Sequence, residues 1–282
     1  MAEPGGPAGG PSLDELVRAV SVEGEGDEYR ADPGVFGESR VFGGLVVAQA
    51  LHAALRTVDP DRSLHSLHGY FLRPSPPGAP VDLHVARWRD GRSFSSRGVT
   101  ATVDGAVTFE LACSCHVAED GETYEPPVLA GVPGPDDLAF SGQDWPFDVR
   151  DLGPGPPADD GTRSTRRVWL RTVERLPDDP ALHAALLAFM SDMTGSSFRP
   201  ASLEEFGRHT DASLDHALWC HRPLRVDEWI YYDLRPLVSL GGRSTVRGLL
   251  YGPDGRLGAS MAQELLIRRL DEPRPLGPAD RA

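Results

Sequence analysis

The 282-residue chain contains no lysine and no asparagine, and all 28 of its basic residues are arginine. Its 42 acidic residues leave a formal net charge of −14, which disfavours nucleic acid and anionic membranes as partners. No apolar run reaches the ~20 residues that a membrane span requires, and residues 1–12 lack the basic flank and apolar stretch of a secretory signal. We therefore expect a cytoplasmic globular protein.

Cysteines are few, and the familiar cofactor motifs are absent from the sequence. The three cysteines are Cys113, Cys115 and Cys220, an odd number that argues against a disulfide framework. Cys113 and Cys115 share one face of a predicted strand, and no second cysteine pair completes a zinc site. His216 and His221 are expected to point in opposite directions, which argues against a shared metal site. Nucleophile-elbow, Walker A, H-E-x-x-H and dinucleotide signatures are missing, so we expect no cofactor.

Composition divides the chain into two folded units and three connecting or terminal segments. Residues 119–162 hold 11 acidic residues and one arginine among many prolines and glycines, which is typical of a linker. We predict a disordered N-terminus at 1–12, a folded unit at 13–118, the acidic linker at 119–162, a second folded unit at 163–271 and a tail at 272–282.

The two folded units resemble each other, which indicates an internal duplication. Four landmarks recur in the same order: Arg73-Pro74 with Arg222-Pro223, Gly91-Arg92-Ser93 with Gly242-Arg243-Ser244, Arg97-Gly98 with Arg247-Gly248, and Asp104-Gly105 with Asp254-Gly255. In each unit a nearly all-apolar helix candidate (43–58 and 180–193) precedes runs that alternate as antiparallel strands do. A helix that is apolar on every side must be wrapped by its sheet. We therefore predict an α+β double hot-dog, with two antiparallel sheets each wrapped around a long central helix and paired at their edges.

Three polar residues in the second unit are candidates for chemistry. Asp192 ends the apolar helix, where a desolvated carboxylate could take a proton from water near neutral pH. Ser213 and Asp215 share one face at the start of the next strand, and the pattern does not choose between them. Gln263, in the last strand, could orient a water or donate to an oxyanion. For each, an ordinary solvent-facing polar residue remains the alternative interpretation.

Other candidates concern the substrate rather than the reaction. Four arginines at the paired landmarks carry guanidinium groups that suit phosphates: Arg92, Arg97, Arg243 and Arg247. Ion pairs on the sheet surface are the commoner role for such residues. The helix start at Gly43-Gly44 offers backbone N–H groups that could stabilise an oxyanion.

Taken in order, several motifs resemble those of the acyl-CoA thioesterase II family. They are "RVFGGLVVAQAL" (40–51), "LHGYFLRP" (67–74), "RDGRSFSSRGV" (89–99), "SDMT" (191–194), "SLDHALWCHRP" (213–223), "DEWIYYD" (227–233) and "DGRLGASMAQELLIR" (254–268). The resemblance runs from about residue 14 to 270, without the acidic linker. Leu45 and Ala48 stand where the family has Gln and Gly.

The resemblance implies a double hot-dog fold and hydrolysis of acyl-CoA to a free acid and CoA. It also implies a catalytic trio of Asp192, Ser213 and Gln263. In the mechanism that we expect, Asp192 deprotonates a water that Ser213 and Gln263 position. Alternatives are an acyl-enzyme on Ser213, a hot-dog hydratase or dehydratase using Asp215 and His216, and a non-catalytic acyl-CoA-binding protein. A homodimer or homotetramer is expected, because sheet faces exposed in this fold favour self-association.

Overall fold

The computed structural model describes residues 11–34, 36–37, 39–140, 143–144, 146–156, 166–193 and 209–270. Most of the predicted disordered N-terminus (1–10), the end of the predicted linker (157–162) and the tail (272–282) lie outside the described residues. The helices are α1 (Leu13–Val20), α2 (Gly43–Leu55), the short 3-10 helix η1 (Pro135–Asp137) and α3 (Pro180–Ser191).

Strands make up most of the remaining structure. In chain order they are β1 (Glu23–Glu25), β2 (Glu28–Ala31), β3 (Arg62–Phe71), β4 (Val81–Asp90), β5 (Phe94–Val103), β6 (Ala106–Val117), β7 (Gln143–Asp144), β8 (Phe147–Asp151), β9 (Arg166–Thr172), β10 (His209–Ser213), β11 (Asp215–Cys220), β12 (Ile230–Leu240), β13 (Arg243–Tyr251) and β14 (Leu257–Arg269). Every pairing between them is antiparallel, as the alternation in the sequence predicts.

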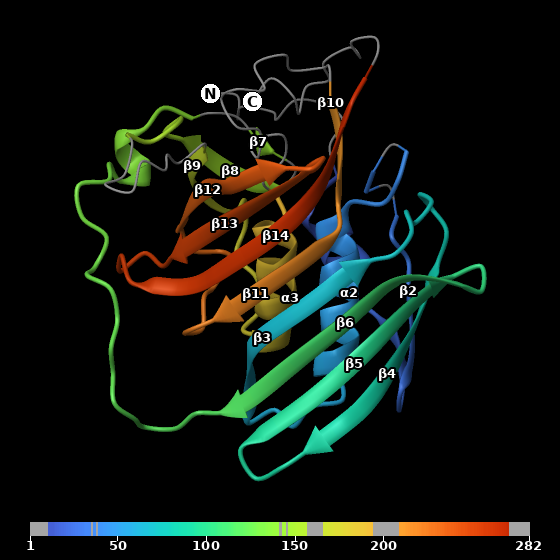
Figure 1. The fold of residues 1–282 in the computed structure, drawn as a ribbon. Coiled ribbons are helices and arrows are strands. Elements are labelled where there is room, and N and C mark those ends of the chain that lie inside the picture. Colours follow the sequence, from blue (N-terminus) through green and yellow to red (C-terminus); the bar gives the residue numbers. More distant parts are fainter. Residues whose placement is uncertain are drawn as a thin grey trace, which may run out of the picture.

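The two halves pair at their edges and so contribute to a single continuous 14-stranded sheet. Its order is β1-β2-β4-β5-β6-β3-β11-β14-β13-β12-β9-β8-β7, and β10 pairs with β14. The join is the pair β3–β11, with Leu67 opposite Leu218 and Gly69 opposite His216 (Figure 1). On either side of this join the order runs 6-5-4-2 and 14-13-12-9. The second half therefore repeats the first, and the join leaves neither half with an open edge there.

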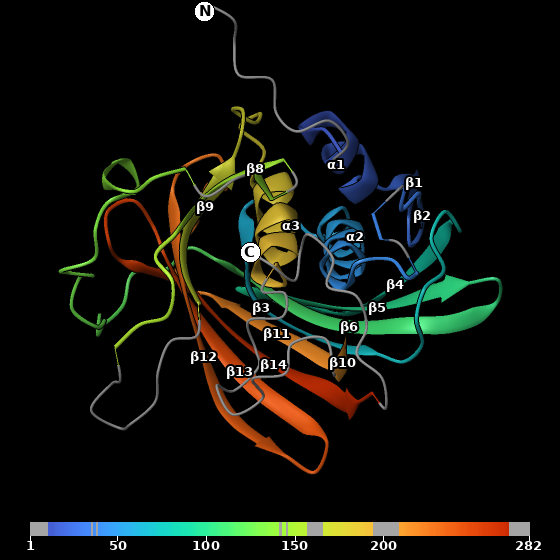
Figure 2. The same cartoon turned by 90° about the horizontal axis from the view of Figure 1, so that it is seen from above.

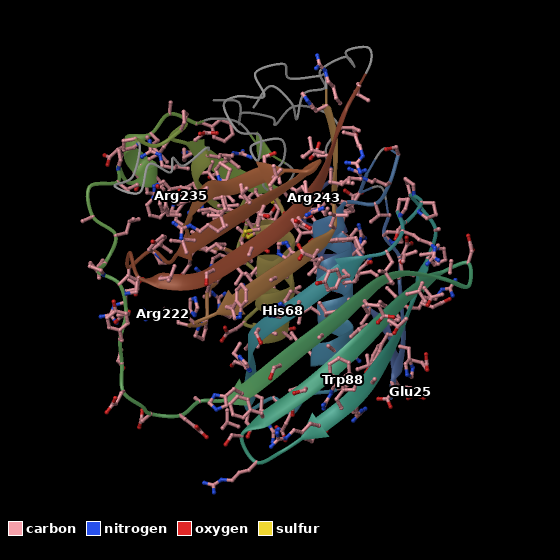
Figure 3. The ribbon with its side chains drawn as sticks, viewed as in Figure 1. Glu25, His68, Trp88, Arg222, Arg235 and Arg243 are labelled. Carbon is pink, nitrogen blue, oxygen red and sulfur yellow. The ribbon has the colours of Figure 1, made fainter. Side chains whose placement is uncertain are left out.

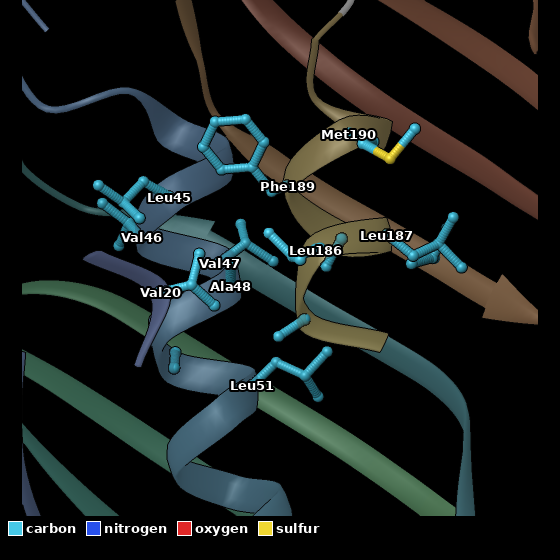
Figure 4. Close-up of a cluster of buried hydrophobic side chains, with 14 of the residues drawn as sticks. Val20, Leu45, Val46, Val47, Ala48, Leu51, Leu186, Leu187, Phe189 and Met190 are labelled. Atoms are coloured by element: carbon cyan, nitrogen blue, oxygen red, sulfur yellow. The ribbon is translucent and has the colours of Figure 1, made fainter. Parts of the chain in front are cut away.

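Helices α2 and α3 lie side by side against the concave face of the curved sheet (Figure 2). Their contact is apolar and includes Leu45, Ala48 and Leu51 from α2 with Leu186 and Phe189 from α3 (Figure 4). Leu45 and Ala48 are fully buried, so the two departures from the family motif lie in the core of the molecule. Burial on nearly every side explains why both helices are apolar all round.

The two helices run in opposite directions. A Cβ built on Gly44, at the start of α2, would lie 3.0 Å from Cβ of Asp192, at the end of α3. At the other end, His52 in the last turn of α2 lies within electrostatic range of Asp179, which caps α3. Each end of the helix pair therefore combines the start of one helix with the end of the other.

Part of the predicted linker belongs to the folded core. Strands β7 and β8 extend the sheet beyond β9, and Phe147 is fully buried with its ring stacked on Phe189 at 5.9 Å between centroids. The sequence analysis did not predict these short strands, because the acidic and proline-rich composition of residues 119–162 is typical of a linker. In the part of the chain that the structure describes, no helix is long and apolar enough to cross a membrane.

Candidate active site

Asp192 lies at the C-terminal end of α3, and only 6% of it is exposed. The Nε2 group of Gln263, on β14, donates hydrogen bonds to Oδ1 of Asp192 at 2.6 Å and to Oγ of Ser213 at 2.9 Å. Ser213 ends β10, which pairs with the same strand. The structure thus brings together the three residues predicted as the catalytic trio, although Asp192 and Gln263 are 71 positions apart in the sequence.

The first half of the chain supplies the start of α2 to this site. The residue before the helix, Phe42, gives no side-chain cap, so the first N–H groups need other partners. The N–H of Gly44 donates to the Asp192 carboxylate. A Cβ on Gly43 would lie 2.9 Å from Oδ2 of Asp192 and 3.2 Å from the Phe71 ring. Glycine at both positions allows the close approach of helix start and carboxylate.

Burial raises the pKa of Asp192 from its usual 3.8 to about 7. Hydrogen bonds from Gln263 and Gly44 and the charge of Arg40 lower this pKa, and the charge of Asp211 raises it, but burial dominates. Arg40 is held beside the site by a hydrogen bond of 2.8 Å to the carbonyl of Asp211. A carboxyl group with this pKa changes charge close to neutral pH, as a general base requires.

His216 also reaches this site, although the sequence analysis named it only in the hydratase alternative, as a partner of Asp215. It is fully buried on β11, its Nε2 lies 2.8 Å from Oγ of Ser191, and its Nδ1 lies 3.9 Å from Oδ1 of Asp192. Burial lowers the pKa of His216 to about 4, so the ring is neutral beside Asp192. The signal available in the sequence was strand alternation, which places His216 and Ser213 on different faces of a regular strand. The irregularity at Leu214, whose N–H donates to Glu264 across the sheet, brings both to one site.

Asp215 faces away from His216. Its Oδ1 accepts a hydrogen bond of 2.6 Å from the N–H of Glu264, and its side chain is only partly buried. The hydratase alternative needs Asp215 and His216 as a working pair, and the structure separates them. His221 bonds Oγ of Ser260 at 2.7 Å, away from His216. Among the described residues, no group of three His, Cys, Asp or Glu side chains is placed to hold a metal ion.

Of the four arginines predicted to contact phosphates, the structure contradicts Arg97. Its guanidinium is buried and donates to Thr57, to Asp90 and to the carbonyls of Arg89 and Ser96. These bonds use the donors that a phosphate would need. Arg243 is exposed and pairs with Glu264 at 3.0 Å. The assignment of Arg92, Arg243 and Arg247 to substrate phosphates stays a prediction.

Comparisons with known proteins agree with this arrangement of fold and site. The model of the acyl-CoA thioesterase N-terminal domain matches residues 32–116, and that of the acyl-CoA thioesterase C-terminal domain matches residues 119–267. A hot-dog-fold protein of unknown function from Alicyclobacillus acidocaldarius, 20% identical, has the same fold with a TM-score of 0.73 over 93% of this chain and 98% of that chain. The fold and the matched domains together define a thioester hydrolase of hot-dog fold.

Individual relatives narrow the class. Acyl-CoA thioesterase 2 of Haemophilus influenzae is 30% identical, with 91% of this chain and 98% of that protein covered. Human acyl-coenzyme A thioesterase 8 is 30% identical, with 81% of each chain covered. The crystal structure of acyl-CoA thioesterase II TesB2 from Mycobacterium marinum is 38% identical and has a TM-score of 0.80 over 91% of this chain and 99% of that one. The chain belongs to the acyl-CoA thioesterase II family, which confirms the resemblance found in the sequence.

Proposed function

We propose that this protein hydrolyses acyl-CoA thioesters and that Asp192 is the general base that activates water. The observation that supports this most directly is the hydrogen-bonded chain of Asp192, Gln263 and Ser213 around a buried carboxyl group with a pKa of about 7. Gln263 fixes Oδ1, and Oδ2 lies beside Gly43 at the start of α2, where we place the water. Ser213 and the Gln263 amide hold that water in line with the thioester carbonyl.

In the reaction, the water oxygen attacks the carbonyl carbon while its proton passes to Asp192. The negative charge that develops on the carbonyl oxygen needs nearby donors, and the start of α2 supplies them. The N–H of Gly44 is bonded to Asp192, so we assign the N–H of Gly43 to the oxyanion. The carbon–sulfur bond then breaks and CoA leaves as a thiolate, which is a good leaving group and needs little acid catalysis.

Nucleophilic attack by Ser213 is the main alternative within the same enzyme class. The hydroxyl of Ser213 is bonded to the Nε2 group of Gln263, which is a donor and cannot take its proton. Among the described residues, no histidine is hydrogen-bonded to Ser213, and the buried His216 bonds Ser191 instead. A serine without a base is a weak nucleophile. The geometry therefore favours attack by water.

Release of free thiol from a panel of acyl-CoA substrates tests the proposal, with Asp192→Asn as the control. We expect turnover by the native enzyme and a loss of on the order of 10³-fold in the variant. Thioesterase activity retained in Asp192→Asn would contradict the role of Asp192. Acid-quench trapping with a labelled acyl group then separates the two mechanisms, because only attack by Ser213 leaves the label on the protein. Binding of acyl-CoA without turnover would instead support a binding protein.

We further propose that each half is one hot-dog unit, with α2 and α3 as the two central helices. The symmetric strand order on either side of the β3–β11 join supports this. The outer face of the sheet, turned away from the helices, carries His68 and Trp88 (Figure 3) with the exposed Tyr70 and Trp219. Exposed aromatic side chains favour association, so we propose a homo-oligomer. Light scattering on the purified protein measures its mass.

A further inference from the structure

His216 is buried between α3 and the sheet, where it lies close to both Ser191 and Asp192. Its Nε2 is 2.8 Å from Oγ of Ser191 and its Nδ1 is 3.9 Å from Oδ1 of Asp192. Nδ1 is buried and has no hydrogen-bond partner among the described residues. A buried polar atom without a partner is rare and needs an explanation, and this one faces the carboxylate of the proposed base.

The hydrogen bonds of Ser191 decide which ring nitrogen of His216 carries the proton. The Ser191 hydroxyl lies 2.8 Å from the carbonyl of Ala188, which can only accept. The N–H of Asp192 is bonded to Phe189 and Met190 rather than to Ala188, as expected where α3 ends. The single hydroxyl proton of Ser191 therefore goes to Ala188, and Oγ must accept its second bond from Nε2–H of His216. Nδ1 is then unprotonated and presents a lone pair to Asp192.

We propose that His216 is a positioning residue that acts through Asp192: held by Ser191 in the Nε2–H form, it directs an unprotonated Nδ1 at the carboxylate and makes that carboxylate a stronger base. A lone pair beside an anion is repulsive, and the repulsion disappears when Asp192 takes the proton of the water. This inference rests on the proposed role of Asp192 and deepens it. The low pKa of His216, caused by burial, keeps the ring in this neutral form.

The other groups that face Asp192 have different effects. Gln263 from β14 and Gly44 from α2 donate to the carboxylate and lower its pKa, as does the charge of Arg40. The charge of Asp211 on β10 raises this pKa. Tyr232 on β12 donates to the carbonyl of Ser191 at 2.7 Å, and burial raises its own pKa, so it stays neutral. His216 is the neutral group among them whose effect depends on a proton position set by Ser191.

The pH profile of kcat/KM tests the proposal through its acidic limb, which follows the pKa of Asp192. In His216→Phe the opposing lone pair is gone, so the limb moves to lower pH, by about half a unit. In Ser191→Ala the ring is free to carry its proton on Nδ1 and to donate it to Asp192, so the limb moves further, by about one unit. Tyr232→Phe is the matched control. It removes a buried hydrogen bond to the carbonyl of Ser191, and we expect it to leave the limb in place.

The double variant Ser191→Ala/His216→Phe tests whether Ser191 affects the pKa of Asp192 through the His216 ring or by disturbing the site as a whole. We expect its limb to coincide with that of His216→Phe, because Ser191 acts only through the ring. An unmoved limb in folded Ser191→Ala, or an equal shift from Ser191→Ala in both backgrounds, would overturn the proposal. Thermal unfolding of each variant shows whether it is folded.

Nitrogen NMR on histidine-labelled protein tests the ring directly and needs no turnover. His216 is assigned as the signal lost in His216→Phe. We expect a protonated Nε2 and an unprotonated Nδ1 at neutral pH, and a change of tautomer in Ser191→Ala. A proton on Nδ1 in the native protein would disprove the proposal even if the enzyme is active. Conversely, the expected tautomer in a protein without thioesterase activity would count against the proposed function alone.

Discussion

The two ends of the α2–α3 pair are built from the same parts and differ in what they leave open. At one end, α2 begins without a side-chain cap, and its Gly44 N–H is bonded to Asp192 from the other half. At the opposite end, α3 begins with Pro180, which has no N–H, and Asp179 caps it by accepting from Ala181 and Leu182. Because Asp179 accepts hydrogen bonds from the first N–H groups of α3, these groups are not available to bind a substrate. One end of the pair is thus suited to chemistry, and the other to stability.

The strands differ in the same way. Aligning Arg73-Pro74 with Arg222-Pro223 pairs Leu64 with Ser213 and Leu67 with His216. Cys113 lies opposite Leu67 on the neighbouring strand. Ala262 pairs with Ala217, so Gln263 lies opposite His216 in the same way. Cys113 is therefore the first-half counterpart of Gln263. The first-half counterparts of the site are therefore buried Leu64, Leu67 and Cys113, which have no acid, base or amide. One half supplies the polar side chains, and the other supplies the helix start.

Neutralising each helix-end aspartate tests the difference between the two ends most strongly. Asp192→Asn should lower kcat/KM by on the order of 10³-fold, because Asn cannot take a proton from water. Asp179→Asn should leave kcat/KM unchanged, because Asn caps a helix about as well as Asp. Both variants keep side-chain size, and thiol release measures both. Equal losses would mean that the two ends are not functionally distinct.

The pH dependence of stability is the next largest expected effect. The folded-state pKa of Asp192, about 7, is above its usual value of 3.8, so the native state holds a proton that the unfolded chain has lost. The free energy of unfolding therefore falls as pH rises from about 4 to 8, by a few kcal/mol. Asp192→Asn does not titrate and lacks this loss. Urea unfolding measures the free energy of unfolding of both proteins at pH 5 and pH 8. We expect the variant to be more stable relative to the native protein at pH 8 than at pH 5. The same difference in stability at both pH values would contradict the raised pKa.

Much of this comparison could be predicted from the sequence, because it depends on periodic patterns. The apolar runs at 43–58 and 180–193 predicted the two buried helices, and the ordered landmarks predicted the duplication. Which strands join the two halves could not be predicted from local patterns, since the pairing of β3 with β11 joins residues 66 and 219. The role of Gly44 as a donor to Asp192 depends on the same long-range contact, and no local signal reveals it.

Strand register explains why one landmark was misleading. Arg97 and Arg247 occupy equivalent places in the sequence, but Arg97 is buried with Ser95 and Val99 on its face of β5. In β13 the buried residues are Val246, Gly248 and Leu250, so Arg247 lies on the other face. The bulges of β4 and β12 lie at the same place in the two halves, since Arg87 pairs with Arg97 before one bulge and Pro236 pairs with Val246 before the other. The structural counterpart of Arg97 is therefore Val246, and this shift of one residue against the landmarks exchanges the faces. Sequence spacing alone does not fix which face a strand residue occupies.

Gln263 and its counterpart Cys113 offer a test on the strands. Gln263→Ala should lower kcat/KM by about 10²-fold, because the carboxylate and Ser213 lose their shared donor. The acidic limb of the pH profile should move to higher pH, since the Gln263 hydrogen bond lowers the pKa of Asp192. Cys113→Ala should leave both the rate and the limb unchanged. A limb that stays in place in Gln263→Ala would argue that the amide does not bond the carboxylate in solution.

The smallest expected effect separates the two landmark arginines. Arg97→Lys should lower the free energy of unfolding by about 2 kcal/mol, because an ammonium group cannot replace the fork that reaches Thr57, Asp90 and the strand carbonyls. Arg247→Lys should change it by less than about 0.5 kcal/mol, since its side chain is on the partly exposed face of β13. Urea unfolding measures both variants under one set of conditions. If the two substitutions cost the same, the faces of β5 and β13 would be equivalent after all, and the shift of register between the halves would be wrong.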